Sequence, residues 1–277
     1  MKEIVIFLTS HFSWVNCIMF CIMNSNIQYF LELLLVMTEK ELRARYKYTI
    51  FGFLWLAANP LIQMIIIYFI FSFFIKNPIE YYQYFLFIGL LVWNFFSLSL
   101  TKGTASIVNE RSLIKKASFP KSVIPLSIIL SNLVHLLIAF VLFTIPIILL
   151  GLLSQDHIIY IIFGLLLLIV FTTGLSLLTS ALNVRYRDVN FFVQALLIVW
   201  FYITPIIYSI EMMPTKLIWL WCFNPMTTII QLIQFGFLNA TPPIINMFLS
   251  NLLIILFIFL LGLIVFSSES KNFDDWV

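Results

Sequence analysis

The stretch ELRARYKYTIFGFLWLAANP, residues 41–60, joins a basic cluster directly to an apolar wall. Four cations stand within eight residues at this junction, namely Lys40, Arg43, Arg45 and Lys47. From Tyr48 the chain then carries no charge until Lys76. A long uncharged apolar run predicts a helix that crosses a membrane, and cations gather on the cytoplasmic side of such helices. The junction therefore predicts a membrane protein whose first crossing starts on the cytoplasmic side.

The composition agrees with a chain that lies in lipid. Its 277 residues are 62% hydrophobic and 10% charged, whereas soluble domains are about 45–50% apolar and about 25% charged. The basic residues flank apolar runs instead of forming a basic folded domain, which argues against nucleic-acid binding. The three cysteines, Cys17, Cys21 and Cys222, show no metal or redox spacing. We therefore expect no metal site and no cofactor.

Six stretches are long and apolar enough to cross a bilayer, which takes about 20 helical residues each. They are approximately residues 50–75, 81–101, 123–150, 158–183, 191–208 and 246–267. Uninterrupted apolar runs of this length favour helices over barrel strands, because lipid-facing and lumen-facing residues alternate along a barrel strand. The predicted fold class is an all-α integral membrane protein, with one six-span domain over residues 49–277.

The charges between the spans predict the orientation. Apart from Lys2, twelve cations precede the first span or follow the second, fourth or sixth, whereas only Lys76 and Lys216 lie in the opposite loops. Positive charge marks the cytoplasmic side of membrane proteins. Both termini are therefore expected in the cytoplasm, in agreement with an even number of spans.

Residues 29–48 predict an amphipathic helix before the first span. Its leucines recur at helical spacing, and Glu39–Arg43 and Glu41–Arg45 are i,i+4 pairs in the favourable order. Such a helix is expected to lie in the headgroup layer with its cations near anionic lipids, as an orientation anchor or as a docking surface for a cytoplasmic partner. Residues 1–28 form an N-terminal extension of unknown role. For residues 1–22, translation from a misassigned start codon is an equal alternative.

The segment from about 210 to 245 differs from the spans. Its two apolar pieces, Leu217–Phe223 and Met226–Phe237, are each too short to cross and are separated by Asn224 and Pro225. Short helices that enter from the outside and turn back fit best between spans five and six. A single poorly formed seventh span is the alternative, but it would place Lys271 outside, against the charge count.

The predicted spans lack the residues that drive ion-coupled transport or membrane-embedded hydrolysis. None contains Asp, Glu, Lys or Arg, and His11, His135 and His157 are dispersed. Such activities usually need intramembrane carboxylates or a metal cluster. The chain also lacks the GxxxxGK[ST] pattern of a P-loop. We therefore expect no catalytic residue, and any uphill transport needs energy from another polypeptide.

Polar side chains nevertheless form stripes on two of the predicted spans. The stripes are Ser127, Ser131 and His135, with Asn132 beside them, on one span, and Thr172, Ser176, Thr179, Ser180 and Asn183 on another. The six candidates for lining a pathway are Ser127, Ser131, His135, Thr172, Ser176 and Thr179. For any single residue, helix–helix packing is the simpler interpretation. The alternative is that the stripes line a pathway for a polar substrate.

Five stretches, in order, resemble the membrane subunit of type-two ABC exporters, in the branch that exports O-antigen and related polysaccharides. The first is ELRARYKYTIFGFLWLAANPLIQMIIIYFIFSFF, which contains the opening junction. The others are NERSLIKKASFPKSVIPLS, NVRYRDVNFFVQALLIVWFYITPIIY, FNPMTTIIQLIQFGF and the ending SESKNFDDWV. The resemblance covers about residues 28–277 and leaves residues 1–27 without a counterpart.

The resemblance implies a permease in the bacterial inner (plasma) membrane. It implies a homodimer of this chain with two copies of a cytoplasmic ABC ATPase, and a pore along the dimer interface for a lipid-linked polysaccharide. The expected partners are these subunits, the substrate and membrane lipids. A teichoic-acid-type polymer is the alternative substrate, and an integral-membrane enzyme acting on lipid-linked sugars is the less favoured alternative class.

The resemblance also implies roles for individual residues. The external segment around Asn224 and Pro225 would gate the exit of the pathway. The surface that couples this chain to the ATPase would comprise Arg43, Arg45, Tyr46, Glu110, Arg111, Arg185, Arg187 and Asp188. A rigid charged helix joined directly to a span is a plausible lever, because ATP closure in a partner does work only through contacts that differ between two states.

Overall fold

The computed structural model describes residues 25–47, 54–72, 81–149, 151, 157–212, 218–238 and 240–276. Over these residues it contains helices and no strand, which confirms the all-α prediction for them. The 3-10 helices in the described part of the chain are η2 (Ile210–Met212) and η4 (Ser270–Asn272). The α-helices are α2 (Ser25–Tyr46), α3 (Leu54–Ser72), α4 (Tyr82–Asn109), α5 (Arg111–Ile114), α6 (Val123–Leu149), α7 (Ile158–Arg185), α8 (Asp188–Ile203), α9 (Ile218–Cys222), α10 (Pro225–Leu238), α11 (Ile245–Glu269) and α12 (Phe273–Trp276). The predicted extension, residues 1–28, falls almost wholly outside the described residues.

Four segments of the described chain are long and apolar enough to cross a membrane: α4, α6, α7 and Ile245–Asn272, which is α11 with η4. At 1.5 Å per residue, each extends about 40 Å, more than the hydrocarbon thickness of about 30 Å. Two further helices coincide with the predicted first and fifth spans, but α3 has 19 residues and α8 has 16. Four crossings are thus supported by length and composition, and the six-span count stays a prediction.

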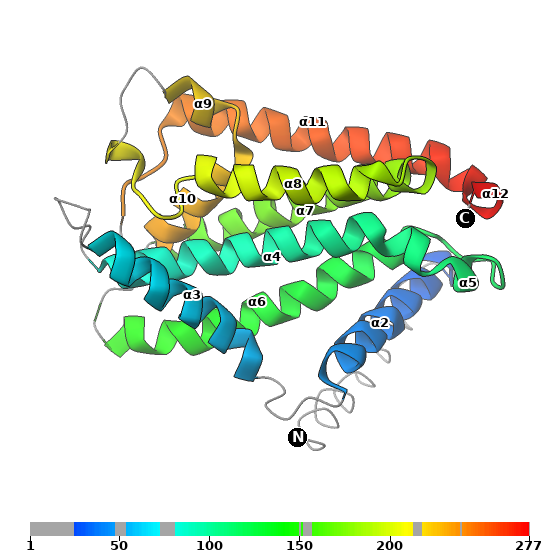
Figure 1. Cartoon of the computed structure of the whole chain (residues 1–277), viewed down its shortest axis with the longest axis horizontal. Coiled ribbons are helices and arrows are strands. Elements are labelled where there is room, and N and C mark those ends of the chain that lie inside the picture. The colour runs from blue at the N-terminus through cyan, green and yellow to red at the C-terminus, as the bar shows by residue number, and fades with distance from the viewer. Residues whose placement is uncertain are drawn as a thin grey trace.

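The long helices lie side by side along the longest axis of the molecule, with α4 in the middle (Figure 1). In the most apolar stretch of α4, 72% of the residues are buried, against 17% in the corresponding stretch of α11. Phe96 on α4 stacks on Phe171 of α7 at 5.6 Å between ring centroids and meets Trp200 of α8 edge-on at 5.3 Å. α4 therefore lies in the core of the bundle, whereas α11 lies at its periphery.

Glycine allows α7 and α11 to approach closely. A Cβ atom on Gly174 of α7 would lie 2.6 Å from the Cα atom of Phe259 on α11, and one on Gly262 would collide with the backbone of Gly174. Only hydrogen fits between the two backbones at these positions. Small residues serve this purpose in membrane helix pairs, where backbone proximity gains van der Waals contact.

The two short apolar pieces of the segment 210–245 form α9 and α10, which lie at the end of the bundle opposite α5 and α12 (Figure 1). Nearly all residues of α10 are buried. Its Gln234 donates a hydrogen bond from Nε2 to the carbonyl oxygen of Phe85 on α4, at 3.1 Å. Re-entrant helices need such cover by protein, and the re-entrant placement of α9 and α10 stays a prediction.

Candidate functional site

Four of the predicted coupling residues lie exposed at one end of the bundle. The corner between α4 and α5, the turn between α7 and α8, and α12 all lie at this end (Figure 1). Arg111, Arg185, Arg187 and Asp188 are exposed there, and Glu110 is partly buried. Segments about 75 residues apart in the chain thus present their charges on the same end of the molecule.

The corner between α4 and α5 is held to α2. Glu110 ends α4 by donating its backbone N–H to the carbonyl oxygen of Ser106 at 3.0 Å. Its carboxylate oxygen Oε1 also accepts a hydrogen bond from Nζ of Lys40, at 2.6 Å. Sequence reasoning counted Lys40 only as a topology signal, because no local pattern connects it to a residue 70 positions away.

The turn between α7 and α8 is built by its charges and by one extended residue. Tyr186 has extended backbone angles, φ −126° and ψ 96°, which end α7. Arg185 lies in the last turn of α7 and Asp188 in the first turn of α8. Each charge is placed where the helix dipole favours it.

The C-terminal segment folds back onto the same end. Phe273 is fully buried in a small apolar cluster that includes Ile107 and Phe266. Lys121 donates a hydrogen bond from Nζ to the carbonyl oxygen of Ser270 at 3.1 Å. The guanidinium of Arg185 lies over the ring of Trp276, 5.3 Å from its centroid. These contacts join the residues just before α6, the end of α7 and the C-terminal helices η4 and α12 at this end of the bundle.

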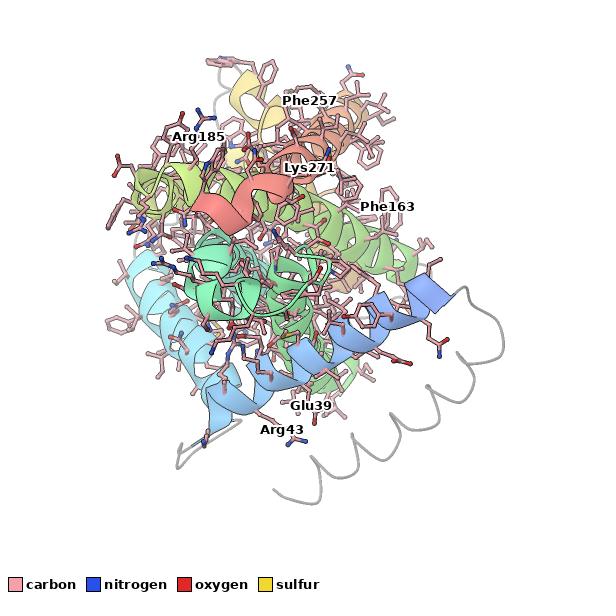
Figure 2. All side chains as sticks on the ribbon, turned by 90° about the vertical axis from the view of Figure 1, so that its right-hand side faces the viewer. Glu39, Arg43, Phe163, Arg185, Phe257 and Lys271 are labelled. Atoms are coloured by element: carbon pink, nitrogen blue, oxygen red, sulfur yellow. The ribbon has the colours of Figure 1, made fainter. Side chains whose placement is uncertain are left out.

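Arg43 and Arg45 on α2 have different surroundings. Figure 2 shows Arg43 on the outer side of α2 with Glu39, its i,i+4 ion-pair partner. The side chain of Arg43 is 64% exposed. Arg45 is half-buried and donates hydrogen bonds to Oδ1 of Asn132, at 2.6 Å, and to Nδ1 of His135, both on α6. The side chain of Tyr46 lies outside the described part of the structure.

The six predicted pathway residues lie within the helix bundle of this single chain. The hydroxyls of Ser127, Thr172 and Thr179 donate to carbonyl oxygens three or four residues earlier in their own helices. Thr179 also bonds Thr104 across α4 and α7 at 2.7 Å. All six are buried except Thr179, which is half-buried; the others are Ser127, Ser131, His135, Thr172 and Ser176.

Helix packing accounts for most of these pathway candidates in the conformation observed. The Oγ atoms of Ser131 and Ser176 are buried without a hydrogen-bond partner. Ser176 lies against Gly103 of α4, where a Cβ atom would collide with its side chain. A role in lining a pathway stays a prediction for all six. Asn132 and Asn183, which the sequence places with these stripes, bond Ser99 and the carbonyl oxygen of Thr104 on α4. Sequence reasoning did not single out Ser99.

At the opposite end, Asn224 ties the predicted gate to α8. Its side-chain oxygen accepts a hydrogen bond from Nε1 of Trp200 at 2.8 Å, and its Nδ2 donates to Oγ1 of Thr204 at 3.0 Å. Pro225 follows as the first residue of α10, where its missing N–H costs nothing because the first turn of a helix has no intrahelical acceptor for it. Asn224 is buried, so this turn is fixed by internal bonds.

The same turn is also held by α11. Asn251 donates from Nδ2 to the carbonyl oxygen of Trp221 at 3.0 Å and to Oγ1 of Thr228 at 2.7 Å. Ser250 donates to the carbonyl oxygen of Cys222 at 3.0 Å. The gate candidate is therefore bound to α8 on one side and to α11 on the other. A lone Asn in an apolar run was the available sequence signal for Asn251, and sequence reasoning did not use it.

The described residues are suited to binding a partner protein and to holding helices and turns together. Among these residues no cluster of three or more His, Cys, Asp or Glu side chains could hold a metal ion. The exposed charges at one end can bind a partner protein, and the buried amides at the other can hold a turn in place.

Known membrane permeases are similar to this chain over most of its length. The O-antigen export system permease protein RfbA of Klebsiella pneumoniae is 35% identical over 264 residues, which cover 91% of this chain and 98% of that protein. A second K. pneumoniae protein of that name is 36% identical over 225 residues, or 79% of this chain and 85% of that protein. The O-antigen export system permease protein RfbA of Myxococcus xanthus is 32% identical over 179 residues, which cover 65% of this chain and 69% of that protein. Residues 32–238 match the family described as ABC-2 type transporter, and the chain belongs to this family.

Proposed function

We propose that this chain is the membrane-spanning subunit of an ATP-driven exporter that moves a lipid-linked, O-antigen-like polysaccharide across the bacterial inner membrane. The observation that carries the proposal is similarity along almost the whole length of relatives named as O-antigen export permeases. Membership of the ABC-2 family implies a partnership with an ABC ATPase subunit. The chain itself is a transporter component and not an enzyme.

The proposed topology has six spans and both termini in the cytoplasm. α3 and α8 supply the first and fifth spans. The division of cations, twelve against two, supports this orientation. α9 and α10 then form the external re-entrant pair, and the high burial of α10 is consistent with such a placement.

The proposed complex contains two copies of this chain and two ATPase subunits. The exposed residues Arg43, Arg111, Arg185, Arg187 and Asp188 form the surface that binds the ATPase. The polysaccharide passes between the two copies, and the turn at Asn224 and Pro225 gates its exit. Support comes from the position of the α4–α5 corner and the α7–α8 turn at one end of the bundle and of α9 and α10 at the other (Figure 1).

Reconstitution tests this function. The chain is co-purified with an ABC ATPase from the same organism, placed in vesicles with a lipid-linked O-antigen-type glycan, and the transfer of glycan between leaflets is measured. We expect transfer that requires ATP and stops when the P-loop lysine of the ATPase is replaced. Preferential transfer of a teichoic-acid-type polymer would overturn the substrate class. ATP hydrolysis without transfer of either polymer would overturn the proposal.

A further inference from the structure

Arg45 is the residue that connects α2 to the interior of the bundle. Figure 1 shows α2 inclined against α6. Thr38, seven residues before Arg45 and therefore on the same helical face, is also buried. Arg45 reaches Asn132 and His135, which lie 9 and 12 residues after the start of α6. At 1.5 Å per residue this is roughly 14–18 Å along that helix. The side chain of Arg45 thus lies beside the body of α6, not at its end.

The hydrogen bonds continue from α6 into α4. Asn132 uses its oxygen to accept from Arg45 and its Nδ2 to donate to Oγ of Ser99 on α4, at 2.9 Å. Asn132 is 2% exposed, His135 5% and Ser99 0%. One series of hydrogen bonds therefore joins α2, α6 and α4 through buried side chains.

The donors and acceptors in this series have definite roles. A guanidinium only donates, so Nδ1 of His135 must accept and the proton of the neutral ring must be on Nε2. The fork of Arg45 supplies two donors at once, with NH1 directed to His135 and NH2 to Asn132. A lysine ammonium is a compact point charge on a flexible four-carbon stem and does not reproduce this fork. The site is thus shaped for arginine.

We propose that Arg45 is a positioning residue that locks α2 to α6 and α4, and that it does not contact the ATPase. This inference rests on the proposed function. When the partner moves α2, the lock transmits that displacement to two helices of the bundle. Arg43, exposed on the opposite side of α2, stays available for the ATPase. The two arginines of the opening sequence motif therefore have separate tasks.

The first test measures the lock without transport. Hydrogen exchange of residues 25–46 is followed in the complex with the ATPase, in lipid nanodiscs. We expect Arg45→Ala and Asn132→Leu each to raise exchange at the C-terminal part of α2 by about tenfold or more, the scale of a lost buried hydrogen bond to a charged group. The double variant should add little to either single change. Val36→Ala, at a position on α2 that is 62% exposed, is the control and should leave exchange in this region unchanged.

The second test measures coupling as ATP hydrolysed per glycan transferred. We expect Arg45→Ala to retain the ATPase during purification but to raise this ratio at least about fivefold, within the usual range of coupling energies. His135→Gln, which keeps an acceptor, should stay closer to wild type than His135→Leu. If Arg45→Ala does not fold, Arg45→Lys and the two His135 variants carry the test.

The outcomes separate this inference from the proposed function. If the wild-type complex exports no glycan, the proposed function fails, while the exchange experiment still tests the lock. If the wild type exports and Arg45→Ala keeps both normal exchange and a normal coupling ratio, the lock is wrong. Loss of ATPase binding by Arg45→Ala with unchanged exchange would assign Arg45 to the partner surface instead.

Discussion

At the scale of single residues, Asn224 shows how a short polar side chain fixes the gate candidate. Its side chain accepts a hydrogen bond from the indole N–H of Trp200 and donates one to the hydroxyl of Thr204. Asn224 is only 5% exposed. A donor left buried without a partner costs more than the bond itself was worth, because its desolvation is no longer compensated. The gate turn should therefore be sensitive to this one amide.

We expect Asn224→Leu to lower the free energy of unfolding by about 1–3 kcal/mol, since the buried N–H of Trp200 loses its acceptor. The measurement is thermal unfolding of the purified complex. Asn109→Leu, at an exposed position at the end of α4, is the matched control and should change the midpoint little. Equal midpoints for the two variants would show that Asn224 does not stabilise the turn.

Gly262 tests close helix packing at the same scale. Gly262→Ala should lower the free energy of unfolding by about 1–3 kcal/mol, because its Cβ atom would collide with the backbone of Gly174 and force α7 and α11 apart. Leu260→Ala, at a position 57% exposed on α11, is the comparison and removes no internal contact of this kind. A Gly262→Ala protein as stable as wild type would mean that the two helices can separate at little cost.

At the scale of elements, Arg45 and Lys40 attach α2 to the bundle through polar contacts of different kinds. Arg45 enters the interior, whereas the pair Lys40–Glu110 lies nearer the surface, with side-chain exposures of 48% and 28%. Exposed ion pairs contribute about 0–1 kcal/mol to stability. Their orientation can still matter for coupling, because this pair connects α2 to the corner that precedes α5.

A charge swap tests that connection. We expect Lys40→Glu to place two carboxylates together, to leave stability within about 1 kcal/mol of wild type, and to raise the ATP hydrolysed per glycan. The double variant Lys40→Glu/Glu110→Lys should recover much of the normal ratio, which is the measurement that separates pairing from mere loss of charge. A double variant no better than Lys40→Glu would remove the pair from the coupling path.

Sequence patterns predicted the helices better than they predicted which side chains contact one another. The uncharged runs were sufficient for α4, α6, α7 and α11, because lipid forces the backbone of such a run into helix. Helical spacing also placed His135 and Ser131 on one face of α6. It could not identify Arg45 as the partner of His135, since the two are 90 residues apart and only the folded chain brings them together.

At the scale of the whole molecule, the topology depends on whether α3, with 19 residues, and α8, with 16, cross the membrane. If α3 and α8 both cross, the α4–α5 corner and the α7–α8 turn share a side with α2 and α12. If one of them does not, the cations that follow it lie on the opposite side, against the charge distribution. In the structure, α5, α12 and the α7–α8 turn lie together at one end (Figure 1). Each of α3 and α8 is therefore predicted to have one flanking residue on the cytoplasmic side and one on the external side, which labelling can test.

Cysteine labelling in whole cells resolves each crossing separately, in a variant whose three cysteines, at positions 17, 21 and 222, are replaced by serine. For α3 the probes are Lys47→Cys and Tyr81→Cys, and for α8 they are Arg187→Cys and Glu211→Cys; all four positions are exposed in the structure. An impermeant maleimide should label the cysteines at 81 and 211 in intact spheroplasts, and those at 47 and 187 only after permeabilisation. Arg111→Cys, on the cytoplasmic side by the same reasoning, is the control for membrane integrity. If positions 187 and 211 label from the same side, α8 does not cross, and the same result at 47 and 81 would exclude α3 as a span.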